Sequence, residues 1–178
     1  MPNDHFLRKA QEIFHQMKEI RRDLHRHPEL GLQEKRTSGI VADYLERLGL
    51  DVKTGIGGTG VVATLYSQSG AETVSLRADM DALPMADKKD VVFASAVNGI
   101  AHCCGHDGHT AMLLGTANLL CDCSDSLKGN VKFIFQPSEE MIPGGALPII
   151  KRRLKKPTGW GNLFTSPKSR ISGRNGSR

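Results

Sequence analysis

Eight consecutive positions of this sequence gather side chains that bind metal ions or exchange protons. Residues 102–109 contain three histidines, two cysteines, one aspartate and two glycines. Cys104 and His106 are two residues apart, so in an extended segment their side chains would project to the same side. A thiolate and an imidazole placed together suit zinc or another late divalent metal, with Asp107 and His109 as further ligands or as groups that orient an imidazole. The alternative is a surface loop of histidines that binds no ion.

Two pairs of carboxylates follow apolar runs elsewhere in the chain. Glu139 and Glu140 come after a run that ends at Pro137, and adjacent side chains at a strand end would point to opposite sides. One carboxylate could then bind a metal while the other takes a proton from a water molecule. Asp79 and Asp81 share one face at the end of another run, a position where open α/β sheets place site residues. Each pair taken alone is also compatible with solvated acids in a turn.

Hydrophobic periodicity predicts the elements that position these groups. Helical spacing and helix-ending residues favour three helices, the last of them buried, and β-rich runs bounded by turn residues favour four strands. Helices mixed with strands in this order indicate an α/β fold, with a mixed open sheet layered with helices. His25 lies at a helix end, where packing is its expected use. The predicted helices cover residues 6–26, 33–48 and 109–121, and the predicted strands cover 52–56, 61–66, 74–77 and 131–135.

Charge divides the chain into two parts. The net charge of +5 comes from residues 151–178, which hold nine Lys or Arg residues and no acid, and leave 15 basic against 19 acidic residues in 1–150. Residues 1–150 are therefore expected to form the globular part, and 151–178 a basic, disordered tail. A nucleic-acid-binding role for the tail is disfavoured because no recognition module accompanies it. No apolar stretch could span a membrane, no signal peptide is evident, and four unpatterned cysteines fit a reducing compartment, so a cytoplasmic location is expected.

Three motifs in a fixed order carry a resemblance to a known family. They are Asp-Met-Asp-Ala-Leu-Pro at 79–84, Cys-Gly-His-Asp-Gly-His-Thr at 104–110 and Gln-Pro-Ser-Glu-Glu at 136–140, and residues 21–31 add an N-terminal signature. Together they make residues 6–150 similar to the amidohydrolase branch of the aminoacylase/carboxypeptidase metallopeptidase family. That branch includes hippurate hydrolases, N-acyl-amino-acid deacylases and auxin-conjugate hydrolases.

The resemblance implies a zinc-exopeptidase-like catalytic domain that hydrolyses the amide bond of N-acyl amino acids. It implies that Cys104, His106 and Glu140 are metal ligands, that Glu139 is the general base and that Asp81 has a supporting role. Two divalent ions, of zinc, manganese, cobalt or nickel, would share a water molecule and lower its pKa. Glu139 would accept the proton of that water and return it to the leaving amine.

The sequence also departs from this family. Members of the family are longer and supply two further histidine ligands and a dimerising domain, whereas no histidine follows His109 here. The change of pattern after residue 150 therefore suggests a truncated or frame-shifted reading, with three ligands holding a single ion weakly. The alternative to an active hydrolase is a non-catalytic metal-binding remnant or pseudoenzyme.

Overall fold

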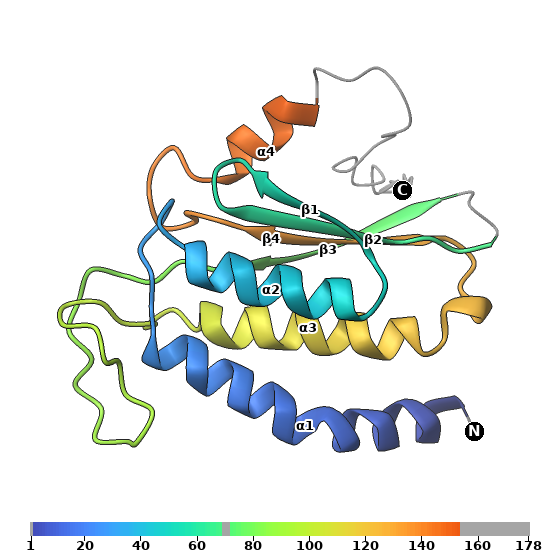
Figure 1. The fold of residues 1–178 in the computed structure, drawn as a ribbon, viewed down its shortest axis with the longest axis horizontal. Coiled ribbons are helices and arrows are strands. Elements are labelled where there is room, and N and C mark those ends of the chain that lie inside the picture. The colour runs from blue at the N-terminus through green and yellow to red at the C-terminus, as the bar shows by residue number, and fades with distance from the viewer. Residues whose placement is uncertain (1, 69–71, 154–178) are drawn as a thin grey trace, which may run out of the picture.

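The computed structural model describes residues 2–68 and 72–153 as one layer of sheet covered by helices (Figure 1). Among these residues, none of the helices combines the length and apolar character needed to cross a membrane. In chain order the elements are α1 (Pro2–Arg26), α2 (Lys35–Arg47), β1 (Asp51–Ile56), β2 (Gly60–Leu65), β3 (Thr73–Asp79), α3 (His106–Cys121), the 3-10 helix η1 (Ser124–Ser126), β4 (Asn130–Gln136) and α4 (Ala146–Arg153).

The four strands form a mixed sheet in the order β1-β2-β4-β3. The pairs β1–β2 and β2–β4 are antiparallel, whereas β3 and β4 run parallel with Asp79 opposite Gln136. The connection from β3 to β4 passes through α3, as a parallel pair requires. This confirms the expected α/β class with a mixed sheet, and it brings the carboxyl ends of β3 and β4 to the same edge.

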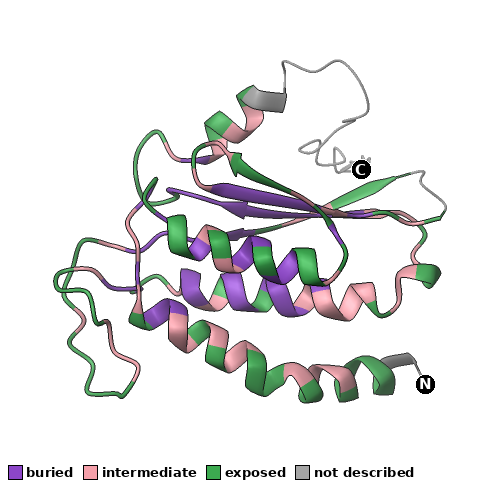
Figure 2. Cartoon of the chain, in the orientation of Figure 1, coloured by how far each residue is buried: buried purple, intermediate pink, exposed green. Residues whose placement is uncertain are grey.

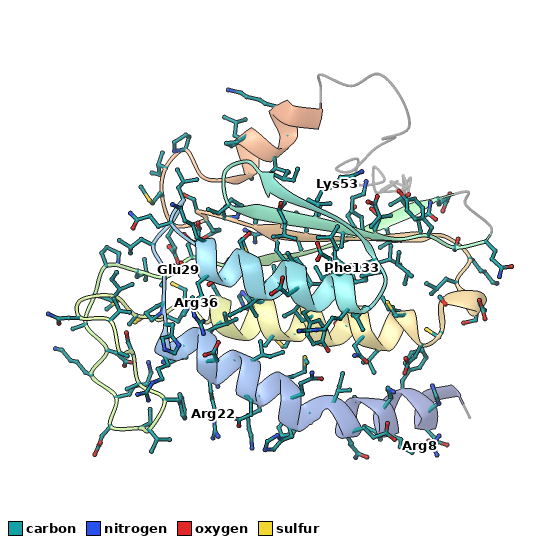
Figure 3. The ribbon with its side chains drawn as sticks, viewed as in Figure 1. Arg8, Arg22, Glu29, Arg36, Lys53 and Phe133 are labelled. Carbon is teal, nitrogen blue, oxygen red and sulfur yellow. The ribbon has the colours of Figure 1, made fainter. Side chains whose placement is uncertain are left out.

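The core lies between the sheet and the two helices α2 and α3 (Figures 1 and 2). Phe133 and Phe135 of β4 are fully buried there with Leu114 of α3, and Figure 3 marks Phe133 between the two layers. The long helix α1 packs on α3 rather than on the sheet. Gly115 permits this approach, since a Cβ atom at that position would lie 3.1 Å from the Met17 sulfur.

The predicted helices and strands are all present, and their ends differ from the expected ones by a few residues. The largest internal difference is that α3 begins at His106 rather than near His109, because Gly105 adopts a left-handed φ of 86° and turns the chain directly into the helix. The helix α4 had not been predicted, and it continues to Arg153, past the expected start of the basic tail at residue 151. Residues 154–178 of that tail lie outside the described residues, so the domain boundary at 150 stays a prediction.

Candidate metal and catalytic site

The parallel pair β3–β4 places two groups of acids at one edge of the sheet. Asp79 ends β3 directly opposite Gln136, which ends β4. Asp81 follows two residues after Asp79, and its Oδ2 accepts a hydrogen bond of 3.0 Å from the backbone amide of Glu140. The end of β3 with Asp79, the loop with Asp81 and the loop with Glu139 and Glu140 therefore meet where the strands end, a place where open α/β sheets commonly bind ligands.

His106 is the residue that both loops face. It is buried at the first position of α3, and its Nδ1 lies 2.9 Å from the carbonyl oxygen of Asp81. When Nδ1 carries the proton for this bond, Nε2 is left with its lone pair directed at the carboxylates, as a metal-binding imidazole needs. Burial alone would lower the pKa of His106, but the hydrogen bond to Asp81 and the charge of Asp79 outweigh it and raise that pKa.

Asp81 is held ionised by its neighbours. Burial opposes the charge, but hydrogen bonds from His106 and from the backbone amides of Glu140 and Glu139 keep the pKa of Asp81 below its ordinary value. An anionic carboxylate beside the ring fixes the orientation of His106. The supporting role that the resemblance implied for Asp81 stays a prediction.

Three expected metal ligands come together at this edge. One ligand atom from each of Cys104, His106 and Glu140 lies within 4.8 Å of the other two. Cys104 hydrogen-bonds to the Glu140 carboxylate, and this bond is the main reason that the pKa of the thiol rises to about 11. A thiol, an imidazole nitrogen and a carboxylate form a donor set of the kind that binds zinc and similar ions, and a cation there would take the place of the thiol proton. The residues present therefore fit a divalent metal.

The geometry expected for these side chains from strand alternation is wrong. Glu139 and Glu140 were expected to point to opposite sides, yet Oε2 of Glu139 lies 4.0 Å and Oε1 of Glu140 lies 3.8 Å from the same His106 Nε2. The strand alternation does not apply, because β4 ends at Gln136 and Ser138 has a positive φ of 51° that turns the chain. Cys104 and His106 likewise meet through the turn at Gly105, not along an extended segment.

A second group of potential ligands shares His106. Atoms of Asp79, His106 and His109 lie within 4.8 Å of one another, with His109 Nδ1 2.6 Å from Asp79 Oδ1 and the two histidine rings stacked at 5.7 Å. The sequence left His109 either as a further ligand or as the start of a helix, and it did not pair His109 with Asp79. The i,i+3 spacing of His106 and His109 would have revealed their common face if the helix had been started at His106.

A cavity of about 410 Å³ adjoins this second group along the outer edge of β3. It reaches the site only through Asp79 and His109, and Cys104 and Glu140 do not line it. Its lining residues come from β3 and α3: Leu76, Arg77, Ala78, Asp79, His109, Met112, Leu113 and Thr116.

Another buried polar cluster lies on a different side of the first turn of α3. Asp107 Oδ2 is 2.7 Å from His25 Nδ1 and 3.1 Å from Arg21 Nε, both on α1. His25 Nε2 lies 3.3 Å from Asp87 Oδ2. Burial opposes the charge of Asp107, but the hydrogen bond to His25 and the charges of His102, His25 and Arg21 lower its pKa. The sequence predicted a packing use for His25, whereas the structure places its buried ring between the Asp87 and Asp107 carboxylates.

Comparison with known proteins assigns the chain to a family. Residues 75–169 match the model of peptidase family M20/M25/M40. The chain is 48% identical to thermostable carboxypeptidase 2 of Saccharolobus solfataricus, over 75% of this chain and 34% of the relative. It is 44% identical to the N-acyl-L-amino acid amidohydrolase of Geobacillus stearothermophilus, over 74% of this chain and 35% of the relative.

A solved structure of a protein from the same family is also similar to this chain. The YXEP protein of Bacillus subtilis, described as a dinuclear metal binding peptidase from the M20 family, is 39% identical with a TM-score of 0.76, over 81% of this chain and 40% of that one. The chain spans about a third of the length of the curated relatives it matches.

Proposed function

The chain belongs to peptidase family M20/M25/M40, and from this premise we propose that it carries part of the active site of a metal-dependent amidohydrolase acting on N-acyl amino acids. One observation carries the proposal, namely the convergence of Cys104, His106 and Glu140 within 4.8 Å. The substrate class follows from the names of similar proteins, which include an N-acyl-L-amino acid amidohydrolase and an N-acetyl-L-cysteine deacetylase.

Cys104, His106 and Glu140 would hold a divalent ion, of zinc, manganese, cobalt or nickel. Such an ion supplies a Lewis acid that polarises the amide carbonyl and lowers the pKa of water. His106 offers Nε2 because its Nδ1 is committed to the carbonyl oxygen of Asp81. The relative described as dinuclear supports two ions for the longer proteins, and the group of Cys104, His106 and Glu140 supports one ion in this chain.

Glu139 is the proposed general base. Its side chain is 41% exposed, so water can reach the carboxylate, and its Oε2 lies 4.0 Å from His106 Nε2. From there the carboxylate can take a proton from the attacking water and deliver it to the leaving amine, a transfer within the ordinary reach of general acid–base catalysis. Asp81 does not touch the substrate in this proposal and instead holds His106 and the amide of Glu140 in place.

A second candidate function is metal binding without turnover. The chain spans about a third of the length of the curated relatives. This favours the alternative, because the remaining parts of those relatives could supply further metal ligands and substrate contacts. Under this alternative the three ligands bind an ion and no amide bond is cut.

The two candidates are separated by titrating the purified chain with Co²⁺ and then assaying hydrolysis of hippurate and an N-acetyl amino acid. A thiolate-to-cobalt absorption band reports the Cys104 ligand directly. Cys104→Ala should lose the band and hydrolysis, whereas Glu139→Gln should keep the band and lose hydrolysis. The matched control is Cys103→Ala, which removes the neighbouring exposed thiol and should change neither.

The outcomes decide between the candidates. Hydrolysis that survives Glu139→Gln would exclude Glu139 as the base. A cobalt band without hydrolysis in the unmodified chain would favour the metal-binding alternative. A chain that binds no Co²⁺ would contradict both.

A further inference from the structure

Glu34 is a buried carboxylate to which the proposed reaction assigns no role. It directly precedes α2, and none of its surface is exposed. Burying a carboxylate is costly unless hydrogen bonds compensate it. Its Oε1 accepts the backbone amide of Ser138 at 2.7 Å, and its Oε2 accepts the hydroxyl of Thr59. The carboxylate is therefore directed toward the loop that follows β4.

That loop has an unusual backbone conformation at the residue that Glu34 contacts. Ser138 is buried and has a φ of 51°, a left-handed value that residues other than glycine rarely adopt. Such a conformation persists only where the surroundings hold it. The Ser138 carbonyl oxygen accepts the amide of Gly145 at 2.7 Å, so both backbone polar groups of this residue are fixed.

The loop is also packed closely against the segment before Glu34. A Cβ atom at Gly31 would lie 2.8 Å from the Ser138 hydroxyl oxygen and 3.1 Å from its Cα, so the two segments are in close contact and a side chain at position 31 would require a shift. Two residues after Ser138, the amide of Glu140 donates to Asp81. Buried carboxylates thus hold alternate amides of this loop, Glu34 at position 138 and Asp81 at position 140.

Capping of α2 does not explain why the Glu34 carboxylate is buried, because Glu29 caps this helix. The Glu34 side chain makes no capping hydrogen bond to its own helix. Glu29 accepts the amides of Arg36 at 2.9 Å and Thr37 at 2.8 Å, and Figure 3 shows Glu29 and Arg36 near the same end of α2. The two acids therefore have separate uses, one at the helix and one at the loop.

We propose that Glu34 is a positioning residue that fixes the left-handed turn at Ser138 and thereby aims the Glu139 and Glu140 carboxylates at His106. The inference rests on the proposed function, in which Glu140 is a metal ligand and Glu139 the base. Without the Glu34 carboxylate the Ser138 amide would lose its buried acceptor, and the turn would relax toward an extended strand ending. Alternation along a strand would then separate the two carboxylates.

The first test measures Co²⁺ affinity and the cobalt absorption spectrum in the full chain. Glu34→Ala should weaken Co²⁺ binding by about 10-fold, the low end of the effect of residues that orient metal ligands. Glu34→Gln should restore most of the affinity, since its amide oxygen can still accept the Ser138 amide. Glu29→Ala is the matched control, because it removes a carboxylate that caps the same helix and should leave the spectrum unchanged and the affinity within about 2-fold.

The second test measures amide hydrogen exchange at Ser138 and Glu140, and it needs no bound ion. Exchange should become faster in Glu34→Ala and stay unchanged in Glu29→Ala. Thr59→Val, which removes only the hydroxyl donor to Glu34, should give a smaller effect in the same direction and serves if Glu34→Ala does not fold.

Wild-type exchange rates in folded Glu34→Ala, or in Thr59→Val where Glu34→Ala does not fold, would overturn the proposal, as would an equal loss of Co²⁺ affinity in Glu29→Ala. If the unmodified chain binds no Co²⁺, the proposed function fails, and the exchange rates alone decide whether Glu34 holds the loop.

Discussion

His106 and Asp107 are neighbours in the chain, yet they belong to polar clusters of opposite character. The ligand cluster consists of Cys104, His106 and Glu140, and its thiol, imidazole and carboxylate face one common point. The anchoring cluster consists of Arg21, His25, Asp87 and Asp107, and it joins α1 to the start of α3 and the loop after β3.

The difference lies in the balance of donors and acceptors. In the anchoring cluster, nitrogen atoms of Arg21 and His25 lie against the Asp107 carboxylate, and Lys89 Nζ lies 3.1 Å from Asp87 Oδ1, so each carboxylate has nitrogen neighbours within the protein. Around the ligand cluster, the His106 ring lies near the carboxylates of Asp79, Asp81, Glu139 and Glu140. Among the described residues, the ion pairs of these carboxylates with Lys or Arg are limited to Arg77 at Asp79. A surplus of acceptors beside an imidazole is stabilised by a cation, whereas carboxylates that already lie against nitrogen donors need one less, although Asp107 Oδ1 has no hydrogen-bond partner among the described residues.

The largest effect is expected when the anchoring cluster is disrupted by a substitution at Asp107. Asp107→Ala should lower the free energy of unfolding by about 3 kcal/mol, because it removes two hydrogen bonds to charged or polarised groups and leaves His25 buried without that partner. Urea denaturation measures the loss. The control is Glu19→Ala, an exposed carboxylate 3.3 Å from Arg22, which should change stability by less than about 0.5 kcal/mol. A loss below about 1 kcal/mol for Asp107→Ala would show that this cluster does not anchor α1.

The next effect concerns the ligand cluster alone. His106→Ala should weaken Co²⁺ binding by about 100-fold or more, since a direct ligand contributes at least as much as the groups that orient it. Calorimetric titration with Co²⁺ measures the affinity. His15→Ala, which removes an exposed histidine on α1, controls for adventitious imidazole binding and should have no effect. Equal affinities for His106→Ala and the unmodified chain would place the ion elsewhere.

A third prediction uses pH to test the anchoring cluster. The Ser95 amide and the Lys89 amide and ammonium hold the pKa of Asp87 well below its ordinary value of 3.8, against the opposing effect of burial. The ionised form therefore stabilises the fold above pH 3.8, and this contribution is lost as the pH falls through the lower folded-state pKa. Asp87→Asn should cost about 1–2 kcal/mol at pH 7 and progressively less below about pH 4. Urea midpoints across this range measure the difference, and a cost that does not vary with pH would contradict it.

The smallest effect separates the two donors to Asp107. Arg21 is 48% exposed, so solvent screens its pairing with Asp107. Arg21→Ala should lower the free energy of unfolding by less than about 1 kcal/mol, well below the loss for Asp107→Ala. Denaturation at low and high salt measures both the loss and its screening. A loss as large as that of Asp107→Ala would mean that Arg21, and not His25, is the main partner.

Local pattern was sufficient to predict most elements of the fold. Apolar spacing predicted the three long helices and the four strands, because the periodicity of apolar residues is a local property of the sequence. It missed α4, a short helix whose Pro148 and run of basic residues give little periodic signal.

Residue type determined the chemistry of the candidate site before any geometry was known. Cys104, His106 and Glu140 were chosen because their donor atoms suit a divalent ion and because the motifs resemble a family, and the structure brings the three together. What the sequence could not supply was the direction of each side chain. That depends on the positive φ values at Gly105 and Ser138, which no alternation rule anticipates.

Only the tertiary structure decided which polar partner each of these residues contacts. Nothing local distinguishes Glu29 from Glu34, or His106 from Asp107, as helix cap, loop support, ligand or anchor. Their partners lie as far as 104 residues away in the chain, as for the Glu34 carboxylate and the Ser138 amide. The sequence by itself determined which elements form and which atoms can bind a metal, because these depend on local periodicity and residue chemistry. The pairing of buried polar groups depends on the packing of distant elements, and only the fold brings those elements together.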